Sequence, residues 1–232
     1  MRMQAHDVED GYRVWLSGDE IDELLEKLQE RGGSMHKMAG RLGVHGGLRR
    51  DEASKSRPID VVEGTRDDTV LRVWEDQTKG DKYRETPIPD ELATQMNMIP
   101  ELKDQDVDDP VLGVTGKTLN RWVKRAGKEL AVEHNDEGWR KVTFHDLRRT
   151  WGTRMLETGV LPSVVMLYGG WENWETFRKH YLGQFSPDAL ARERRKVEWL
   201  GGNDGGQAPP DAGAPPVTTA APPTGTPRRG QD

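Results

Sequence analysis

Six positions along the chain carry side chains that suit chemistry at a phosphate group. In sequence order they are Arg49, Lys79, His145, Arg148, Trp171 and Tyr181. An arginine binds phosphate oxygens through two parallel N–H donors, a lysine or histidine can transfer a proton, and a tyrosine hydroxyl can act as a nucleophile. The chain has no cysteine, and no motif with metal-ligand spacing is evident. The combination predicts cleavage and rejoining of a phosphodiester without metal or cofactor, with Tyr181 as the nucleophile.

The pair His145 and Arg148 stands at the start of a predicted helix. Residues three apart share a helix face, and the free backbone N–H groups of the first turn favour anions, so a phosphate would bind well there. A structural interpretation is equally open, in which Arg148 pairs with a surface carboxylate and His145 helps to cap the helix. The pair alone does not decide between them.

The N-terminal part of the chain is predicted to contain two helical stretches. Ser17 and Glu20 form a capping-box pattern before apolar residues at helical spacing, so a helix is expected over 18–30. A second stretch covers 34–43. It leads into the segment that carries Arg49.

A β-hairpin is predicted next. Apolar residues within 70–74 and 86–88 indicate two strands, and 78–82 contains the turn between them. Lys79 lies in this turn, and Lys82 is the alternative candidate for a catalytic lysine. Because lysines in a hairpin turn are ordinarily solvated, the position alone marks neither as catalytic.

A helix predicted over 117–131 has one apolar and one cationic face. The cations are Lys117, Arg121, Lys124, Arg125 and Lys128. The formal net charge of -6 is unusual for a protein that binds nucleic acid, since neutralisation of phosphates by Lys and Arg supplies much of the affinity. Five cations on one face provide a local phosphate-binding surface despite this total. An ordinary solvated face is the alternative, but we expect contact with DNA.

The C-terminal half is predicted to be helical. Thr143 with Asp146 marks the start of one helix, Pro162 opens a shorter one, and Tyr181 lies on the next. A last helix is expected over 187–200. With the hairpin, the pattern predicts a mostly helical chain with one small sheet.

Length and composition predict one domain. Residues 11–200 are enough for a single core, 1–10 form a short extension, and 201–232 form a Pro- and Gly-rich tail that we expect to be disordered. No apolar run approaches the roughly 20 residues of a membrane span, and the N-terminus lacks a signal-peptide core. We expect a soluble cytoplasmic protein, associated with the nucleoid and not with a membrane.

Taken in order, the fragments resemble the tyrosine recombinase (phage integrase) family. They are Gly47-Leu48-Arg49 with Glu52, Thr78-Lys79-Gly80, His145-Asp146-Leu147-Arg148, Gly170-Trp171 and Tyr181. Each is short, but the joint order, which spans about residues 12 to 182, is specific. The resemblance implies an α+β catalytic domain, mostly helical with one small antiparallel sheet, that acts on double-stranded DNA.

By this resemblance, two arginines bind the scissile phosphate. Arg49 and Arg148 would hold its non-bridging oxygens, a task for which the forked guanidinium suits better than lysine. Glu52 would orient Arg49 as a supporting residue. Arg50 could take the place of Arg49 if the alignment were shifted by one residue, but the position of Leu48 favours Arg49.

The remaining roles also follow from the resemblance. Lys79 would protonate the leaving 5'-oxygen, His145 would hydrogen-bond the phosphate, and Tyr181 would attack phosphorus to form a 3'-phosphotyrosine. Trp171 occupies a position where many members have His and some have Trp; its indole N–H can donate but cannot act as a base. A core tryptophan is the alternative interpretation. The cationic helix over 117–131 would enter the major groove.

Two further features concern partners. Members usually carry a helical core-binding domain before the catalytic one, and only about ten residues precede it here, so a separate core-binding partner or a minimal recombinase is expected. Residues 186–200 resemble the segment that members pass to a neighbouring protomer, which implies a homo-oligomer on DNA.

We therefore expect a site-specific DNA recombinase or integrase of virus or plasmid type, acting through Tyr181. The alternative is a non-catalytic, recombinase-like DNA-binding regulator. These motifs do not specify the target sequence or the direction of the reaction.

Overall fold

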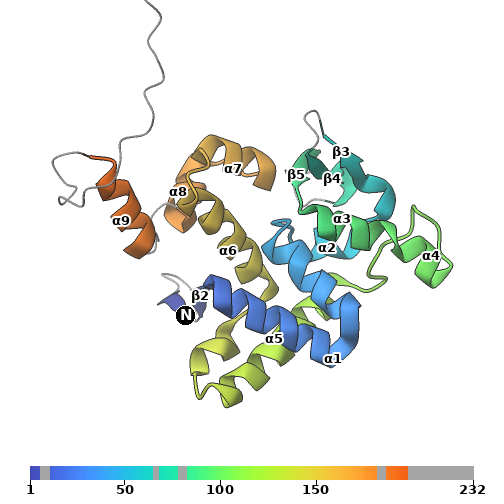
Figure 1. Ribbon diagram of the computed structural model, residues 1–232, viewed down its shortest axis with the longest axis horizontal. Coiled ribbons are helices and arrows are strands. Elements are labelled where there is room, and N and C mark those ends of the chain that lie inside the picture. The colour runs from blue at the N-terminus through green and yellow to red at the C-terminus, as the bar shows by residue number, and fades with distance from the viewer. Residues whose placement is uncertain (6–10, 65–67, 78–82, 182–186, 198–232) are drawn as a thin grey trace, which may run out of the picture. The chain divides into compact units, whose positions relative to one another are not determined.

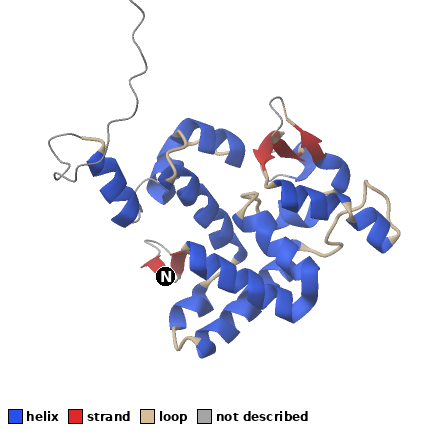
Figure 2. Cartoon of the chain, viewed as in Figure 1, coloured by secondary structure: helices blue, strands red, loops and turns tan. Residues whose placement is uncertain are grey.

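The computed structural model describes residues 1–5, 11–64, 68–77, 83–181 and 187–197. The chain divides into two units, Met1–Ala191 and Arg192–Asp232. The first is mostly helical with small antiparallel sheets (Figures 1 and 2). The predicted fold class is thereby confirmed.

The first long helix, α1 (Gly18–Val44), begins with the predicted capping box. The Ser17 side chain accepts a hydrogen bond from the Glu20 backbone N–H, and the Glu20 carboxylate accepts from the Ser17 N–H. Gly32 and Gly33 have non-helical backbone angles inside α1, and Gly33 has a φ of 66°, which favours glycine. This kink separates the two helical stretches expected from the sequence.

A three-stranded antiparallel sheet has the order β3 (Val61–Glu63), β4 (Thr69–Val73) and β5 (Arg84–Pro87). Strands β4 and β5 form the predicted hairpin, with Val73 paired to Arg84. Strand β5 begins earlier than predicted, and β3 was not predicted. The turn at 78–82, with Lys79 and Lys82, lies outside the described residues.

A second, two-stranded sheet was also not predicted. Strands β1 (Arg2–Ala5) and β2 (Tyr12–Trp15) pair antiparallel. The partners that hold β2 come from a distant helix: the Val14 N–H donates to the Asp146 carboxylate at 3.1 Å, and the Leu16 N–H donates to the Thr150 hydroxyl at 3.1 Å. Because these contacts span more than 130 residues, no local pattern reveals them.

The other α-helices of the described residues follow the predicted order, with three short additional α-helices. The additions are α2 (Arg50–Lys55), α3 (Asp90–Asn97) and α4 (Ile99–Lys103). Three short 3-10 helices, at Pro58–Asp60, Glu75–Gln77 and Glu137–Lys141, were not predicted either. The predicted helices are α5 (Gly116–Glu133), α6 (Phe144–Glu157), α7 (Pro162–Gly169), α8 (Trp174–Tyr181) and α9 (Pro187–Arg195). The predicted end of the last helix, at 198–200, lies outside the described residues. Among the helices that the structure describes, none is long and apolar enough to cross a membrane.

In the part of the chain that the structure describes, most buried apolar residues belong to two clusters. The larger one joins α1, α5 and α6, and includes Leu28, Leu42, Leu119 and Phe144. The smaller contains Trp151, Leu156, Val165 and Phe177, with Trp171 packed against it. Through its members in both clusters, α6 packs against the main core and against α7 and α8. This is the helix that carries His145 and Arg148.

Candidate active site

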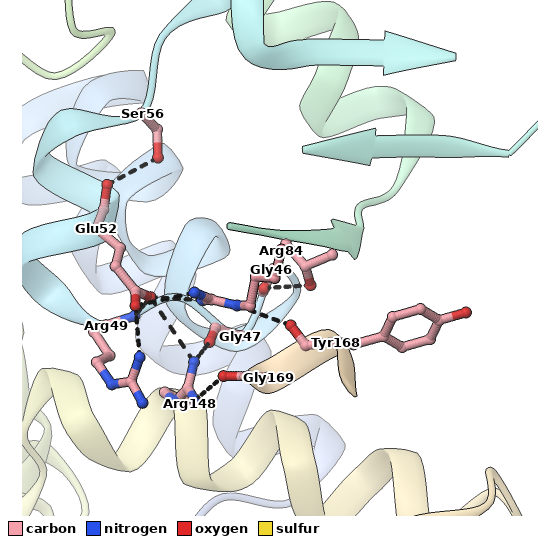
Figure 3. Close-up of polar contacts among 10 residues, drawn as sticks. Gly46, Gly47, Arg49, Glu52, Ser56, Arg84, Arg148, Tyr168 and Gly169 are labelled. Atoms are coloured by element: carbon pink, nitrogen blue, oxygen red, sulfur yellow. Dashed lines mark hydrogen bonds and ion pairs between the residues drawn. The ribbon is translucent and has the colours of Figure 1, made fainter. Parts of the chain in front are cut away.

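The carboxylate of Glu52 is the centre of a cluster of three arginines (Figure 3). Glu52 Oε1 lies 2.7 Å from Arg49 Nη1, and its two oxygens lie 3.1 and 2.7 Å from Nη1 and Nη2 of Arg84. Arg148 Nη1 lies 3.8 Å from Glu52 Oε2. The Glu52 side chain is only 1 % exposed. Three guanidinium groups therefore share one buried carboxylate, with an excess of two positive charges.

Arg49 is fixed at the N-terminus of α2 by Glu52. The Arg49 backbone N–H donates to Glu52 Oε2 at 2.7 Å, while the guanidinium donates to Oε1. The Arg49 side chain remains 34 % exposed. Its neighbour Arg50 instead lies 3.7 Å from Asp51 and is 47 % exposed. Of the two candidates for the first arginine, Arg49 is the one that joins the cluster.

Arg148 is buried, with no exposed side-chain surface. It donates to two backbone carbonyls, Gly47 O and Gly169 O, each at 2.5 Å. Gly47 has a φ of 66°, and a Cβ there would lie 2.5 Å from the Trp151 ring. A side chain at position 47 would displace the carbonyl that orients Arg148.

Trp171 lies against Arg148. The guanidinium carbon of Arg148 is 4.2 Å from the centre of the indole, within the range of an attractive cation–π contact. The same ring stacks on Trp151 at 6.1 Å and meets Phe177 at 5.2 Å. Trp171 is thus part of the smaller apolar cluster and a neighbour of the arginine cluster, so the two interpretations of this residue are compatible.

His145 lies in a neighbouring hollow of about 380 Å³. The hollow is lined by Arg49, Arg50, Asp51, Asn120, Thr143 and His145. Although His145 and Arg148 share α6, His145 is exposed at its first turn and Arg148 is buried. Asn120 of α5 accepts a hydrogen bond from the Phe144 N–H at 3.0 Å. This bond ties α5 to the start of α6 at the edge of the hollow.

The arginines keep Glu52 ionised. Burial would raise the pKa of Glu52, but the charge of Arg84, its hydrogen bonds, and the charges of Arg148 and Arg49 lower this pKa from 4.5 to about 2. The cluster therefore holds the same charge at every pH near neutrality.

Tyr181 is the last residue of α8; its side chain and Lys79 lie outside what is described. The other three tyrosines do not face the arginines. The ring of Tyr168 points away from the cluster (Figure 3), and Tyr12 lies under Lys141 at 5.4 Å. Tyr83 donates to Glu85 at 2.5 Å, and partial burial with this carboxylate raises the pKa of Tyr83, which disfavours a phenolate.

The cations of α5 form an exposed row, which we call the cationic face. Its members Lys117, Arg121, Lys124, Arg125 and Lys128 are all exposed. The opposite side of α5 is buried, with Leu119, Val123 and Leu130 almost inaccessible to solvent. Glu129 beside the face pairs with Arg31 of α1. The amphipathic division predicted for this helix is therefore present.

Sequence reasoning missed Arg84. Strand periodicity could have found it, because Arg84, Thr86 and Ile88 occupy the buried parity of this segment while Glu85 faces outward. A charged residue at an inward strand position needs a partner. Here that partner is Glu52. Within the described ranges, no group of three or more His, Cys, Asp or Glu residues could hold a metal ion.

The site resembles those of known proteins. Residues 14–186 match the phage integrase family. A segment of 59 residues is 36% identical to the integrase of Salmonella phage P22, and covers 25% of this chain and 15% of that protein.

Solved structures show the same fold. The XerA recombinase superposes with a TM-score of 0.61 at 22% identity, covering 80% of this chain and 65% of XerA. The Tn1549 transposon integrase in complex with a circular intermediate DNA gives 0.61 at 18% identity, covering 82% and 67%. The catalytic domain of bacteriophage HP1 integrase gives 0.54 at 21% identity, covering 80% and 95%.

The chain thus spans about two thirds of XerA but nearly all of the HP1 catalytic domain. The family match covers more than half of this chain. The chain therefore belongs to the phage integrase family and has the fold of a tyrosine recombinase catalytic domain.

Proposed function

We propose that the chain is the catalytic part of a site-specific DNA recombinase or integrase that acts through a 3'-phosphotyrosine intermediate. The observation that carries the proposal is the convergence of Arg49 and Arg148 on Glu52, with Trp171 against Arg148 and His145 in the adjoining hollow. These residues come from distant parts of the chain. Family membership and the DNA bound to the Tn1549 integrase support a DNA substrate.

In the proposed reaction, the Tyr181 phenol loses its proton to water, and its oxygen attacks the scissile phosphorus as the bond from phosphorus to the 5'-oxygen breaks. The leaving 5'-oxygen takes a proton from Lys79. Arg49 and Arg148 stabilise the charge that develops on the non-bridging oxygens, which is the largest contribution in many such sites. His145 donates to the same phosphate. In the reverse step, a 5'-hydroxyl gives its proton back to Lys79 and attacks the phosphotyrosine. The bond from phosphorus to the Tyr181 oxygen breaks, the phenol regains a proton from water, and the DNA bond is restored without an external energy source.

Arg148 imposes a condition on this mechanism. Because its side chain has no exposed surface, a phosphate contacts the guanidinium only after a covering group moves. Trp171 lies over that guanidinium. We propose that the indole shifts when the scissile phosphate enters, and that its N–H then donates to a phosphate oxygen.

Four more specific predictions, on origin, location and partners, are part of this proposal. They are the viral or plasmid origin, association with the nucleoid, homo-oligomer formation through 186–200 and a separate core-binding partner. Each stays a prediction from the family resemblance. The P22 and HP1 integrases are phage proteins, which supports the viral origin.

The test uses nicked DNA duplexes tiled across the regions that flank the protein's own reading frame. A nick beside the cleavage site lets the cut fragment diffuse away, so the covalent complex accumulates and is seen on a denaturing gel. We expect an adduct with the wild-type chain, none with Tyr181→Phe, and at least about 100-fold less with Arg148→Ala, as for loss of a transition-state donor. Arg140→Ala, which changes an exposed arginine paired with Glu137, should behave as wild type.

Two outcomes contradict parts of the proposal. An adduct that persists in Tyr181→Phe would show that another residue is the nucleophile. Specific DNA binding without any adduct would favour the non-catalytic regulator.

A further inference from the structure

Arg84 uses all three guanidinium nitrogens within the protein. Nη1 and Nη2 donate to the two oxygens of Glu52 at 3.1 and 2.7 Å, and Nε donates to Tyr168 O at 2.9 Å. The side chain is 5 % exposed. Arg49, in contrast, remains one-third exposed. Arg84 is therefore built into the cluster, whereas Arg49 can reach a ligand.

Arg84 is the main counter-charge of Glu52. A fork of two parallel N–H donors on one carboxylate is a strong ionic arrangement, and Arg84 makes this contact (Figure 3). Arg148 stays 3.8 Å from the carboxylate and directs hydrogen bonds to the neutral carbonyls of Gly47 and Gly169. Arg148 thus makes a longer ion pair with Glu52 than Arg84 does.

Strand β5 and Arg148 also bind consecutive carbonyls at two places. Arg84 donates a hydrogen bond to Tyr168 O, and Arg148 donates one to the next carbonyl, Gly169 O. The Thr86 hydroxyl donates to Gly46 O at 2.9 Å, while Arg148 takes Gly47 O. The same strand therefore fixes both backbone segments that orient Arg148.

We propose that Arg84 is a positioning residue for DNA cleavage: it neutralises Glu52, so that Arg49 and Arg148 keep their positive charge for the scissile phosphate. The inference rests on the proposed function for the identity of that phosphate. If Arg84 were absent, the nearest cations to the buried Glu52 carboxylate would be Arg49 and Arg148. Glu52, which already binds Arg49 at 2.7 Å and pairs with Arg148 at 3.8 Å, would then attract both more strongly and compete with the phosphate for them.

The test is whether removing the charge of Glu52 restores phosphate binding in a variant that lacks Arg84. Arg84→Met leaves Glu52 charged, whereas Arg84→Met combined with Glu52→Gln removes the competing charge as well. Arg72→Met is the matched control, because Arg72 lies on the adjacent strand, is 40% exposed and faces Glu85 at 3.5 Å. Arg84→Lys keeps the charge without the fork, and remains informative if Arg84→Met does not fold.

The first measurement requires no catalysis. Inorganic phosphate is titrated at constant ionic strength, and its apparent Kd is taken from the rise in Tm. We expect Arg84→Met to weaken phosphate binding about tenfold, or roughly 1.4 kcal/mol, with Arg84→Lys in between and Arg72→Met unchanged. The double variant should bind more tightly than Arg84→Met. A residue that only braced the fold would give a double variant no better than the single one.

The second measurement is the single-turnover rate of adduct formation on nicked DNA. Arg84→Met should slow it about 10- to 100-fold, less than loss of a donor that touches the transition state, while the Kd for DNA stays nearly constant. The double variant should again be faster than Arg84→Met.

The inference is overturned if Arg84→Met binds phosphate as wild type does, if Glu52→Gln restores nothing, or if phosphate fails to stabilise the wild-type chain. Absence of an adduct with wild type counts against the proposed function alone. In that case the phosphate titration still decides the role of Arg84.

Discussion

At the scale of single residues, Glu52 determines how the arginine cluster responds to pH. A carboxylate whose pKa falls from 4.5 to about 2 on folding favours the folded state, because the ionised form is stabilised there. This contribution is complete above the unfolded pKa and is lost as the pH falls from 4.5 toward 2. The charge on Glu52 therefore does not change across the range in which a recombinase would be assayed.

Glu52→Gln should destabilise the chain by about 3 to 5 kcal/mol near pH 7, since it leaves buried Arg84 without its ionic partner. The difference from wild type should shrink as the pH drops from 4.5 toward about 2, the range over which wild-type Glu52 loses its contribution. Urea unfolding across this range measures both. Glu137→Gln is the control, because Glu137 is 76% exposed; a difference for Glu52→Gln that did not vary with pH would contradict the assignment.

The sequence pointed to Arg49 and Arg148 because the order of the fragments along the chain resembles that of the family, and the structure brings both side chains to Glu52. The contacts that hold Glu52 and Arg148 in the cluster could not be predicted. Arg84 lies 32 residues from Glu52, and Arg148 lies 101 residues from Gly47. Only folding brings these pairs together. The buried state of Arg148 was likewise not predictable, since its spacing from His145 suggested one shared exposed face.

At the scale of elements, local periodicity accounts for what the sequence predicted well. The apolar face of α5 and the capping boxes of α1 and α6 depend on residues within a few positions of one another. The sheet of β1 and β2 was not predicted, and its contacts with α6 come from the Val14 N–H in β2 and the Leu16 N–H just after it, which donate to Asp146 and Thr150. Elements that are stabilised by residues far away in the sequence have no local sequence pattern that predicts them.

The bond between Asn120 and the Phe144 N–H ties the cationic helix to the helix that carries His145. Asn120→Ala leaves that N–H without its partner and should cost about 1 to 3 kcal/mol. Adduct formation should fall more than DNA affinity, because the cations of α5 are untouched. Thr115→Ala is the control, since Thr115 caps only its own helix α5. Equal losses in both variants would show that the link between helices is unimportant.

At the scale of the whole molecule, the charge is unevenly distributed. The chain carries a formal net charge of -6, yet the cationic face presents five exposed cations along one helix. DNA affinity in such a protein depends on where the cations lie, since each phosphate contact releases condensed counterions. Total charge is a poor guide to this property.

Replacing all five residues of the cationic face with Gln should weaken DNA binding and flatten its salt dependence. The slope of log K against log salt concentration should fall by about 0.9 for each phosphate that the variant no longer neutralises. Fluorescence anisotropy with a labelled duplex measures both. The control replaces five other exposed cations, Lys55, Lys103, Arg140, Lys141 and Arg154, and has the same net charge. If the slope decreased equally in both variants, the face would have no special part in binding.

The carbonyls that hold Arg148 have a consequence for how this site tolerates change. Gly47 O and Gly169 O belong to the main chain, so no substitution elsewhere removes the acceptors themselves. A library that randomises the side chains around Arg148 should therefore retain its orientation in many members. Intolerance should concentrate at two glycines: Gly47, which has a positive φ and where a Cβ would meet the Trp151 ring, and Gly169, where a Cβ would meet the Trp171 ring. The orientation of Arg148 is therefore set by the backbone, so it should tolerate many changes of the surrounding side chains but few at Gly47 and Gly169.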